Sequence, residues 1–188
     1  QIQDFERVEL INGTTLTLER DFQLSSGISA AKRSANLDTN NLAGWLAIDG
    51  SSTLAALQDG HSVLGSVANA GRVTLSNGIA GKALTVSGDF AGVNGVVELE
   101  TVLGDDSSVT DKLVVQGNTS GQTFLQVNNA GGTGAYTTAD GIQVVEVGGE
   151  SEGNFTLANR VVAGSNEYLL NKGSKTDAAD GNWYLRSE

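Results

Sequence analysis

Short runs in which apolar and polar residues alternate recur along the whole chain, separated by turns rich in Gly, Asn, Asp and Ser. Alternation with a period of two is the pattern of a half-buried β-strand. Because the chain contains no proline, these four residue types must make the turns. The pattern predicts an all-β protein of short strands, whose clearest runs lie at residues 8–10, 16–18, 46–48, 73–75, 84–86, 96–99, 113–115, 124–127, 142–147, 155–157, 160–163 and 168–170.

Similar positions in this pattern return at regular intervals, 27 residues from Leu46 to Val73 and 24 residues from Val73 to Val97. Coils of roughly 20 to 30 residues that stack on one another are typical of solenoids, in which a single coil cannot bury its inner face alone. The sequence therefore predicts a β-helix in which Asn69, Asn77 and Asn94 are suited to left-handed corner conformations. Its inward ladders are expected to contain Val73, Leu75, Leu84, Val86, Val97 and Leu99.

Two segments depart from the regular spacing. Residues 25–44 are polar and contain almost no strand formers, which indicates a loop with one helical turn. After residue 122 the spacing loosens, and six of the ten aromatic residues follow. Since large side chains bury more apolar area per ordered residue, they suit the closed end of a solenoid. We therefore divide the chain into β-helix coils at 1–122, with a polar loop at 25–44, and last coils with a C-terminal cap at 123–188.

Composition excludes several classes of protein. Eleven Lys and Arg residues against 22 Asp and Glu residues give 188 residues a net charge of −11, which repels phosphate backbones and excludes nucleic acid as a partner. No apolar run approaches the roughly 20 residues of a membrane helix. The absence of cysteine excludes disulfides and cysteine metal sites. Because the chain starts at Gln1 and contains no methionine, we expect a piece of a larger protein.

Acidic residues form two candidate sites. Asp105, Asp106 and Asp111 surround the turn GDDSSVTDK and could supply oxygen ligands to calcium, but their spacing matches no calcium loop and favours a solvated turn. Glu98 and Glu100 could act as an acid and base pair on sugars. Alternation puts both on one strand face, and we interpret that face as the polar outside of the solenoid.

The remaining candidates for chemistry are weak. His61 is the only histidine, and no nucleophile motif such as GxSxG accompanies it. The glycine-rich run NNAGGTGAY lacks a phosphate-binding lysine and a following helix, so we interpret it as a flexible turn. We predict no enzyme, no catalytic or metal-binding residues and no cofactor.

From residue 71 onward the chain resembles the C-terminal passenger region of Gram-negative autotransporters, the pertactin-like or autochaperone segment. The resemblance rests on AGKALTVSGDFAG (80–92), TVLGDDSSVTDKLVVQGNTSG (101–121), NNAGG (128–132), GIQVVEV (141–147), FTLANRVVAGSNEYLL (155–170) and DGNWYLRS (180–187). It implies a right-handed parallel β-helix that ends just before a membrane-embedded β-barrel. It also implies a surface or secreted virulence protein whose C-terminal segment folds early and templates the upstream β-helix.

The open end of a β-helix exposes unpaired backbone groups and apolar interior, so it must be covered. We expect strands near 142–147, 155–157 and 168–170 to form this cover. Its structural residues are expected to be Phe155, Tyr168, Trp183 and Tyr184.

Two other functions stay open at this stage. The chain is alternatively an adhesin module that contacts a host surface protein or glycan, for which Lys32 and Arg33 in the polar loop are the candidate contacts. A β-helix enzyme that acts on polysaccharides would need carboxylates that converge on one face.

Overall fold

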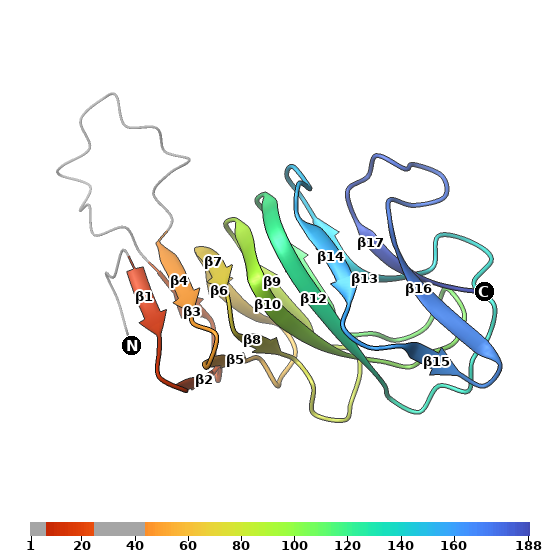
Figure 1. Cartoon of the computed structure of the whole chain (residues 1–188), viewed down its shortest axis with the longest axis horizontal. Coiled ribbons are helices and arrows are strands. Elements are labelled where there is room, and N and C mark those ends of the chain that lie inside the picture. The colour runs from red at the N-terminus through yellow and green to blue at the C-terminus, as the bar shows by residue number, and fades with distance from the viewer. Residues whose placement is uncertain (1–6, 25–43) are drawn as a thin grey trace.

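The computed structural model describes residues 7–24 and 44–188, so the predicted contact residues Lys32 and Arg33 lie outside the described residues. The described residues form seventeen strands and no helix, which confirms the prediction of an all-β chain. Within these ranges, then, no helix is long and apolar enough to cross a membrane. The strands follow one another along the long axis of the molecule, from β1 near the N-terminus to β15–β17 near the C-terminus (Figure 1).

Parallel strands form three stacks, of which the third extends from β3 to β13. The first stack contains β1 (Arg7–Leu10), β4 (Trp45–Ile48) and β7 (Ser66–Asn69). The second contains β2 (Thr15–Thr17), β5 (Thr53–Ala55) and β8 (Arg72–Thr74). The third contains β3 (Phe22–Gln23), β6 (His61–Leu64), β9 (Ala83–Val86), β11 (Lys112–Val115) and β13 (Ile142–Val147). Each strand therefore lies beside one from an earlier or later pass of the chain.

Two long strands join the first and second stacks. β10 (Phe90–Thr101) pairs with β7 through Phe90–Gly92 and with β8 through Val96–Glu98. β12 (Thr119–Asn129) pairs in parallel with β10 along its length. The register shifts between Val93 and Gly95, so Asn94 has no residue opposite it in β12. Such a bulge bends the strand. β12 runs through position 122, where the sequence divides the chain, and that division stays a prediction.

The sheet geometry changes at the C-terminal end. β14 (Asn154–Leu157) still pairs in parallel with β12. β15 (Val161–Ala163), β16 (Asn166–Lys172) and β17 (Trp183–Ser187) pair with one another in antiparallel fashion. β17 also pairs antiparallel with β13, the last strand of the third stack. We call β15, β16 and β17 the C-terminal cover.

The strands form two sheets: the first and second stacks with β10, β12 and β14 make one, and the third stack with the C-terminal cover makes the other. The core lies between these sheets and is built from ladders of aliphatic side chains. Leu46 pairs with Val8 on one side and Val67 on the other. The six residues expected in the inward ladders are at most 1% exposed: Val73, Leu75, Leu84, Val86, Val97 and Leu99. Strand alternation thus identified the buried face, because successive side chains of a strand point to opposite faces.

The predicted corner conformations are only partly correct. Among the described non-glycine residues, only Asn12 and Asn94 have positive φ, at 58° and 61°. The left-handed conformations expected at Asn69 and Asn77 are therefore wrong. Their amide groups instead donate across the stack, Asn69 Nδ2 to the Val96 carbonyl at 3.2 Å and Asn77 Nδ2 to the Leu57 carbonyl at 2.8 Å.

Candidate functional site

The C-terminal cover is joined to the parallel stacks by the hydroxyl group of Tyr168. This side chain is fully buried. Its oxygen lies 2.8 Å from the carbonyl oxygen of Gly104 and 3.0 Å from that of Ala135, and it accepts the N–H of Ala135 at 3.0 Å. Because strand β16 carries Tyr168, this one residue fixes two loops of the stacks against the cover.

Trp183 and Phe155 connect the cover to β14. Trp183, at the start of β17, is 7% exposed and Phe155 is 3% exposed. Their rings meet edge to face, with centroids 5.3 Å apart and an interplanar angle of 61°, which is a favoured aromatic geometry. The ammonium of Lys172 lies 5.9 Å from the Trp183 ring centroid and donates to the carbonyl of Ser151. The Trp183 ring thus contacts Phe155 and has a hydrogen-bonded cation nearby.

Tyr184 is the fourth residue expected in the cap, and it is 8% exposed. Its hydroxyl donates to Asp180 Oδ2 at 2.8 Å, and the guanidinium carbon of Arg186 lies 5.7 Å from its ring centroid. Burial, together with the bond to Asp180, raises the pKa of Tyr184. Arg186 donates to the carbonyls of Asp140 and Gly173, so Tyr184 and Arg186 tie both neighbouring loops to β17.

Asp106 works as a clamp, in contrast to the solvated turn predicted for this segment. Its carboxylate accepts the N–H groups of Thr138, Ala139 and Gly141 at 2.8, 3.1 and 2.7 Å. Burial raises the pKa of Asp106, but these donors outweigh that effect and lower it. The loop that precedes β13 is thus held by a side chain more than 30 residues earlier in the chain.

A second correction concerns Asp111, which is fully buried and not part of a solvated turn. Its Oδ1 lies 3.1 Å from Lys82 Nζ and accepts the N–H groups of Gly81 and Lys82 at 3.0 and 2.9 Å. Its Oδ2 accepts the N–H of Glu100 at 2.9 Å. Lys82 is 6% exposed as a residue. A buried ion pair with this many donors joins two passes of the chain.

The two glutamates of β10 differ in exposure, although alternation put both on an outward face. Glu100 is only 6% exposed and accepts the hydroxyl of Ser76. The Glu98 side chain is 15% exposed and pairs with Arg72 at 2.8 Å. Both carboxylates are thus engaged with side chains of the stacks. Among residues 7–24 and 44–188 no group of three or more His, Cys, Asp or Glu side chains could hold a metal ion.

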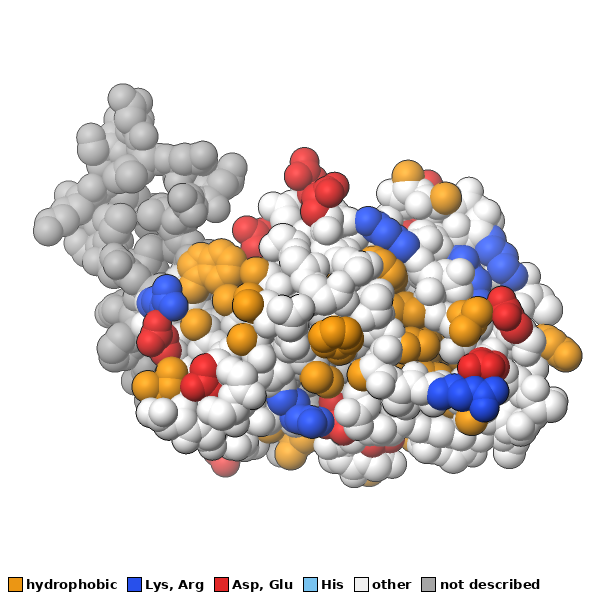
Figure 2. All heavy atoms as spheres, in the orientation of Figure 1, with side chains coloured by type: hydrophobic (Ala, Val, Ile, Leu, Met, Phe, Trp, Pro, Cys, Tyr) orange, Lys and Arg blue, Asp and Glu red, His pale blue; other side chains and the backbone are white. Residues whose placement is uncertain are grey.

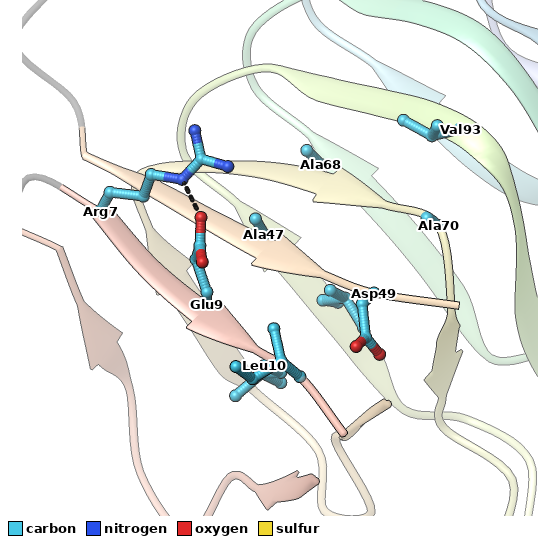
Figure 3. Close-up of a pocket in the computed structure, with 10 residues that line it drawn as sticks. Arg7, Glu9, Leu10, Ala47, Asp49, Ala68, Ala70 and Val93 are labelled. Atoms are coloured by element: carbon cyan, nitrogen blue, oxygen red, sulfur yellow. Dashed lines mark ion pairs between the residues drawn. The ribbon is translucent and has the colours of Figure 1, made fainter. Parts of the chain in front are cut away.

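The surface of the first stack carries a shallow depression of about 290 Å³. Figure 3 shows Ala47 and Ala68 on neighbouring strands of its floor, with the Arg7–Glu9 ion pair at one side. That pair has an N···O distance of 2.7 Å.

On the face of the molecule in Figure 2, basic and acidic side chains are interspersed. The single histidine, His61, is buried at 9% exposure at the start of β6.

Sequence reasoning missed the clamping roles of Asp106 and Asp111. The local signal at both positions is a carboxylate in a Gly- and Ser-rich turn, which is also the signal of a solvent-exposed turn. The donors that bind these carboxylates belong to other segments, so their identity required the fold.

Comparison with known proteins identifies related sequences. The family model described as Autochaperone Domain Type 1 matches residues 52–170. The adhesin BmaC autotransporter of Brucella suis is 48% identical over 113 residues, which are 56% of this chain and 3% of that protein. The autotransporter adhesin AIDA-I of Escherichia coli is 47% identical over 109 residues, 57% of this chain and 8% of that protein.

A third relative extends over more of the chain. The autotransporter adhesin/invasin TibA of Escherichia coli is 31% identical over 180 residues, 94% of this chain and 17% of that protein. The chain therefore spans a small part of each relative. The resemblance seen in the sequence is confirmed, because the family match covers more than half of the chain. The chain belongs to the Autochaperone Domain Type 1 family, the passenger region of autotransporters that reach the bacterial cell surface or are secreted.

Proposed function

We propose that this chain is the C-terminal segment of an autotransporter passenger, where it caps and nucleates a right-handed parallel β-helix and so promotes folding and secretion across the outer membrane. The observation that carries this proposal is the change from parallel stacks to an antiparallel cover at β13 and β17. β17 runs antiparallel along β13, the last strand of the third stack, and pairs with the edge that β13 would otherwise leave open. We propose no enzymatic activity.

The two ends of the third stack differ in a way that supports a direction of growth, because β13 pairs antiparallel with β17 whereas β3 pairs with β6 alone among the described residues. At the N-terminal end β1, β2 and β3 each pair with one strand only among the described residues. Free parallel edges accept further strands. The proposed partners are accordingly the passenger's own upstream β-helix, stacked on these three edges, and an outer-membrane β-barrel downstream.

Nucleation at the cover follows from the energetics of stacked repeats. A first coil must order its backbone without a neighbour, at roughly 1–2 kcal/mol per residue, whereas later coils gain an interface as they form. The side chains of Tyr168, Trp183 and Asp106 supply contacts that a bare coil would lack. A preformed C-terminal end therefore removes the slowest step for the coils that form later. The apolar surface that these coils bury then opposes movement of the chain back across the outer membrane during export.

The two tryptophans permit a direct test, since Trp45 lies in the first stack and Trp183 lies in the cover. The chain is refolded as two single-tryptophan variants, Trp45→Phe and Trp183→Phe, and fluorescence is followed in time. Nucleation at the cover predicts that the signal of Trp183 appears before that of Trp45. Equal rates, or an earlier signal from Trp45, would contradict the proposal. Far-UV circular dichroism of both variants at equilibrium is the control for correct folding.

Secretion provides the second arm of the test. In the full autotransporter, Tyr168→Ala and Trp183→Ala should reduce the amount of passenger at the cell surface. Tyr136→Ala is the matched control, because Tyr136 is 69% exposed. Normal surface display of both cover variants would exclude a role of the cover in export.

An adhesin role is the second candidate, favoured by the three relatives that are themselves named adhesins. The proposed partner is a host surface protein or glycan, and the proposed contacts are Lys32 and Arg33 in the polar loop that the sequence predicts at 25–44. Removal of this loop should abolish binding to host cells and leave export unchanged. Retained binding after its removal would exclude these contacts.

A further inference from the structure

From β6 onward, a glycine followed by a polar residue marks each turn of the chain from the third stack back toward the first. These turns occupy equivalent positions in successive coils, because Phe90 is paired with Val67 and with Thr119, and Thr119 is bridged to Ser151. We call this column of residue pairs the corner ladder. Its members are Gly65–Ser66, Gly88–Asp89, Gly117–Asn118 and Gly149–Glu150.

The glycines of the corner ladder stack on one another through their backbones. The N–H of Gly88 donates to the carbonyl of Gly65 at 2.8 Å. In the same way Gly117 donates to Gly88 at 3.1 Å, and Gly149 donates to Gly117 at 2.9 Å. A Cβ placed on Gly117 would lie 2.6 Å from the carbonyl oxygen of Gly88. Because this approach leaves no room for a side chain, only glycine fits the position without moving the coils apart.

The polar residues form a second column, in which a side-chain oxygen accepts a backbone N–H of the next coil. Ser66 Oγ accepts the N–H of Asp89 at 2.9 Å. Asp89 Oδ1 accepts the N–H of Asn118 at 2.8 Å. Asn118 Oδ1 accepts the N–H of Glu150 at 2.8 Å. A hydroxyl, a carboxylate and an amide thus serve the same position, so the shared requirement is a short side chain with an oxygen acceptor.

The aliphatic ladders of the core do not distinguish registers that differ by two residues. A slip of one residue turns the apolar face of a strand outward, whereas a slip of two residues keeps it inward. The third stack contains two inward rows of paired aliphatic residues: Leu84, Leu113 and Val145, and Val86, Val115 and Val147. A strand moved by two residues would therefore pair aliphatic with aliphatic side chains again.

We propose that Ser66, Asp89 and Asn118 are positioning residues that set the register in which successive coils stack. A slip of two residues would bring Val115 or Thr119 in place of Gly117 against the carbonyl of Gly88, and the N–H of Asn118 would lose its acceptor on Asp89. The inference rests on the proposed function, because the register of the stacks is what a template would pass on to later coils.

The side-chain bonds of the corner ladder all have one direction. In each of them the earlier coil supplies the oxygen and the later coil supplies the N–H. A template that grows from the C-terminal cover therefore offers an N–H, and the coil that arrives brings the oxygen. Trp45 lies opposite Ser66 and carries no oxygen, so the N–H of Ser66 donates to the carbonyl of Gly44 at 2.9 Å instead. Selection by side chains is thus confined to the coils between Ser66 and Glu150.

Cross-linking can report the register of β10 against β12, because the chain has no cysteine of its own. Ala91 lies opposite Ser120, so Ala91→Cys with Ser120→Cys forms a disulfide in the native register. Gln122 lies opposite Val93, and a disulfide needs Cα atoms within about 7 Å. Ala91→Cys with Gln122→Cys therefore reports a slip of two residues. Each double-cysteine chain is refolded under reducing conditions, oxidised and analysed by peptide mapping.

Two substitutions at position 89 separate the oxygen acceptor from the rest of the side chain. Asp89→Ala removes the acceptor and should raise the yield of the 91–122 cross-link several-fold. Asp89→Asn keeps an oxygen and should leave this yield at the level of the parent chain. Asp105→Ala is the matched control, because the Asp105 carboxylate accepts the N–H and the hydroxyl of Ser107 within its own turn. Far-UV circular dichroism of each variant checks that it has folded.

An unchanged yield of the 91–122 cross-link in Asp89→Ala would overturn the inference, and so would an equal rise in Asp89→Asn. The cross-link yields do not depend on which end of the chain folds first. The order of the two tryptophan signals tests the proposed function without reference to register, so either result can fail while the other holds.

Discussion

The hydroxyl oxygen of Tyr168 lies 2.8 Å from the carbonyl oxygen of Gly104, a residue 64 positions earlier in the chain. This bond joins the C-terminal cover to a loop of the parallel stacks. Because the side chain is fully buried, no solvent replaces the bond when the hydroxyl is removed.

Tyr168→Phe should therefore lower the free energy of unfolding by about 1 to 3 kcal/mol, since it leaves buried backbone groups without a partner. Urea unfolding followed by circular dichroism measures the change. Tyr136→Phe removes a hydroxyl from a side chain that is 69% exposed and should leave the midpoint unchanged. Equal effects of the two substitutions would show that the Tyr168 hydroxyl contributes nothing to stability.

The Phe155–Trp183 contact should be measurable as a coupling between two substitutions. Trp183→Ala removes a large buried side chain and should cost about 3 to 5 kcal/mol. In a double-mutant cycle with Phe155→Ala, the edge-to-face geometry predicts a coupling of about 0.5 to 1.5 kcal/mol. Additive effects of the two substitutions would mean that the two rings do not interact in solution.

Substitution of Lys82, which lies in a buried ion pair, should lower stability far more than substitution of Arg160, which lies in an exposed one. Lys82→Met leaves Asp111 buried without its counter-charge and should cost roughly 3 to 5 kcal/mol. Arg160→Met breaks the Arg160–Glu167 pair, in which the arginine side chain is 72% exposed, and should change the unfolding midpoint very little. Thermal unfolding of both variants provides the comparison, and similar losses would contradict the buried location of Lys82.

Acid should weaken the turn at Asp49. The hydroxyls of Ser52 and Ser51 lower the pKa of Asp49 from 3.8 to about 2, and its Oδ2 accepts the N–H of Asn12 at 3.0 Å. Since the folded pKa is below the unfolded value, the unfolded chain binds the proton first as the pH falls. The contribution of Asp49 to stability is therefore complete above pH 3.8 and is lost as the pH falls to about 2.

The measurement compares the chain with its Asp49→Asn variant by chemical denaturation from pH 7 to pH 2. The variant should be less stable at pH 7, and the difference should shrink through the window between the two pKa values. A difference that stays constant down to pH 2 would show that the Asp49 carboxylate does not carry this effect.

Most strands were predictable because their side chains alternate. The run Leu46 to Ile48 became β4 and the run Leu84 to Val86 lies in β9, each with its apolar residues buried. The strand at Ser66–Asn69 was not predicted, because it buries the polar side chains of Ser66 and Asn69 and so lacks apolar alternation.

Less of the candidate site could be predicted. The concentration of aromatic residues after position 122 indicated a terminal unit, and Phe155, Tyr168, Trp183 and Tyr184 are all buried. Their role as a cap stays a prediction. The partners of Tyr168 were not predictable, because Gly104 and Ala135 lie in glycine-rich loops that carry no mark of a long-range contact.

The sequence by itself determined the all-β class, the burial of the six inward ladder residues and the autochaperone motifs, because alternation and motif order are local properties of the chain. Only the tertiary structure decided that the last three strands run antiparallel, that Asp106 and Asp111 are clamps, and that Asn94 is the bulge residue. These features depend on hydrogen bonds and register between segments far apart in sequence. The local sequence around one residue of such a contact does not reveal which distant residue it will contact.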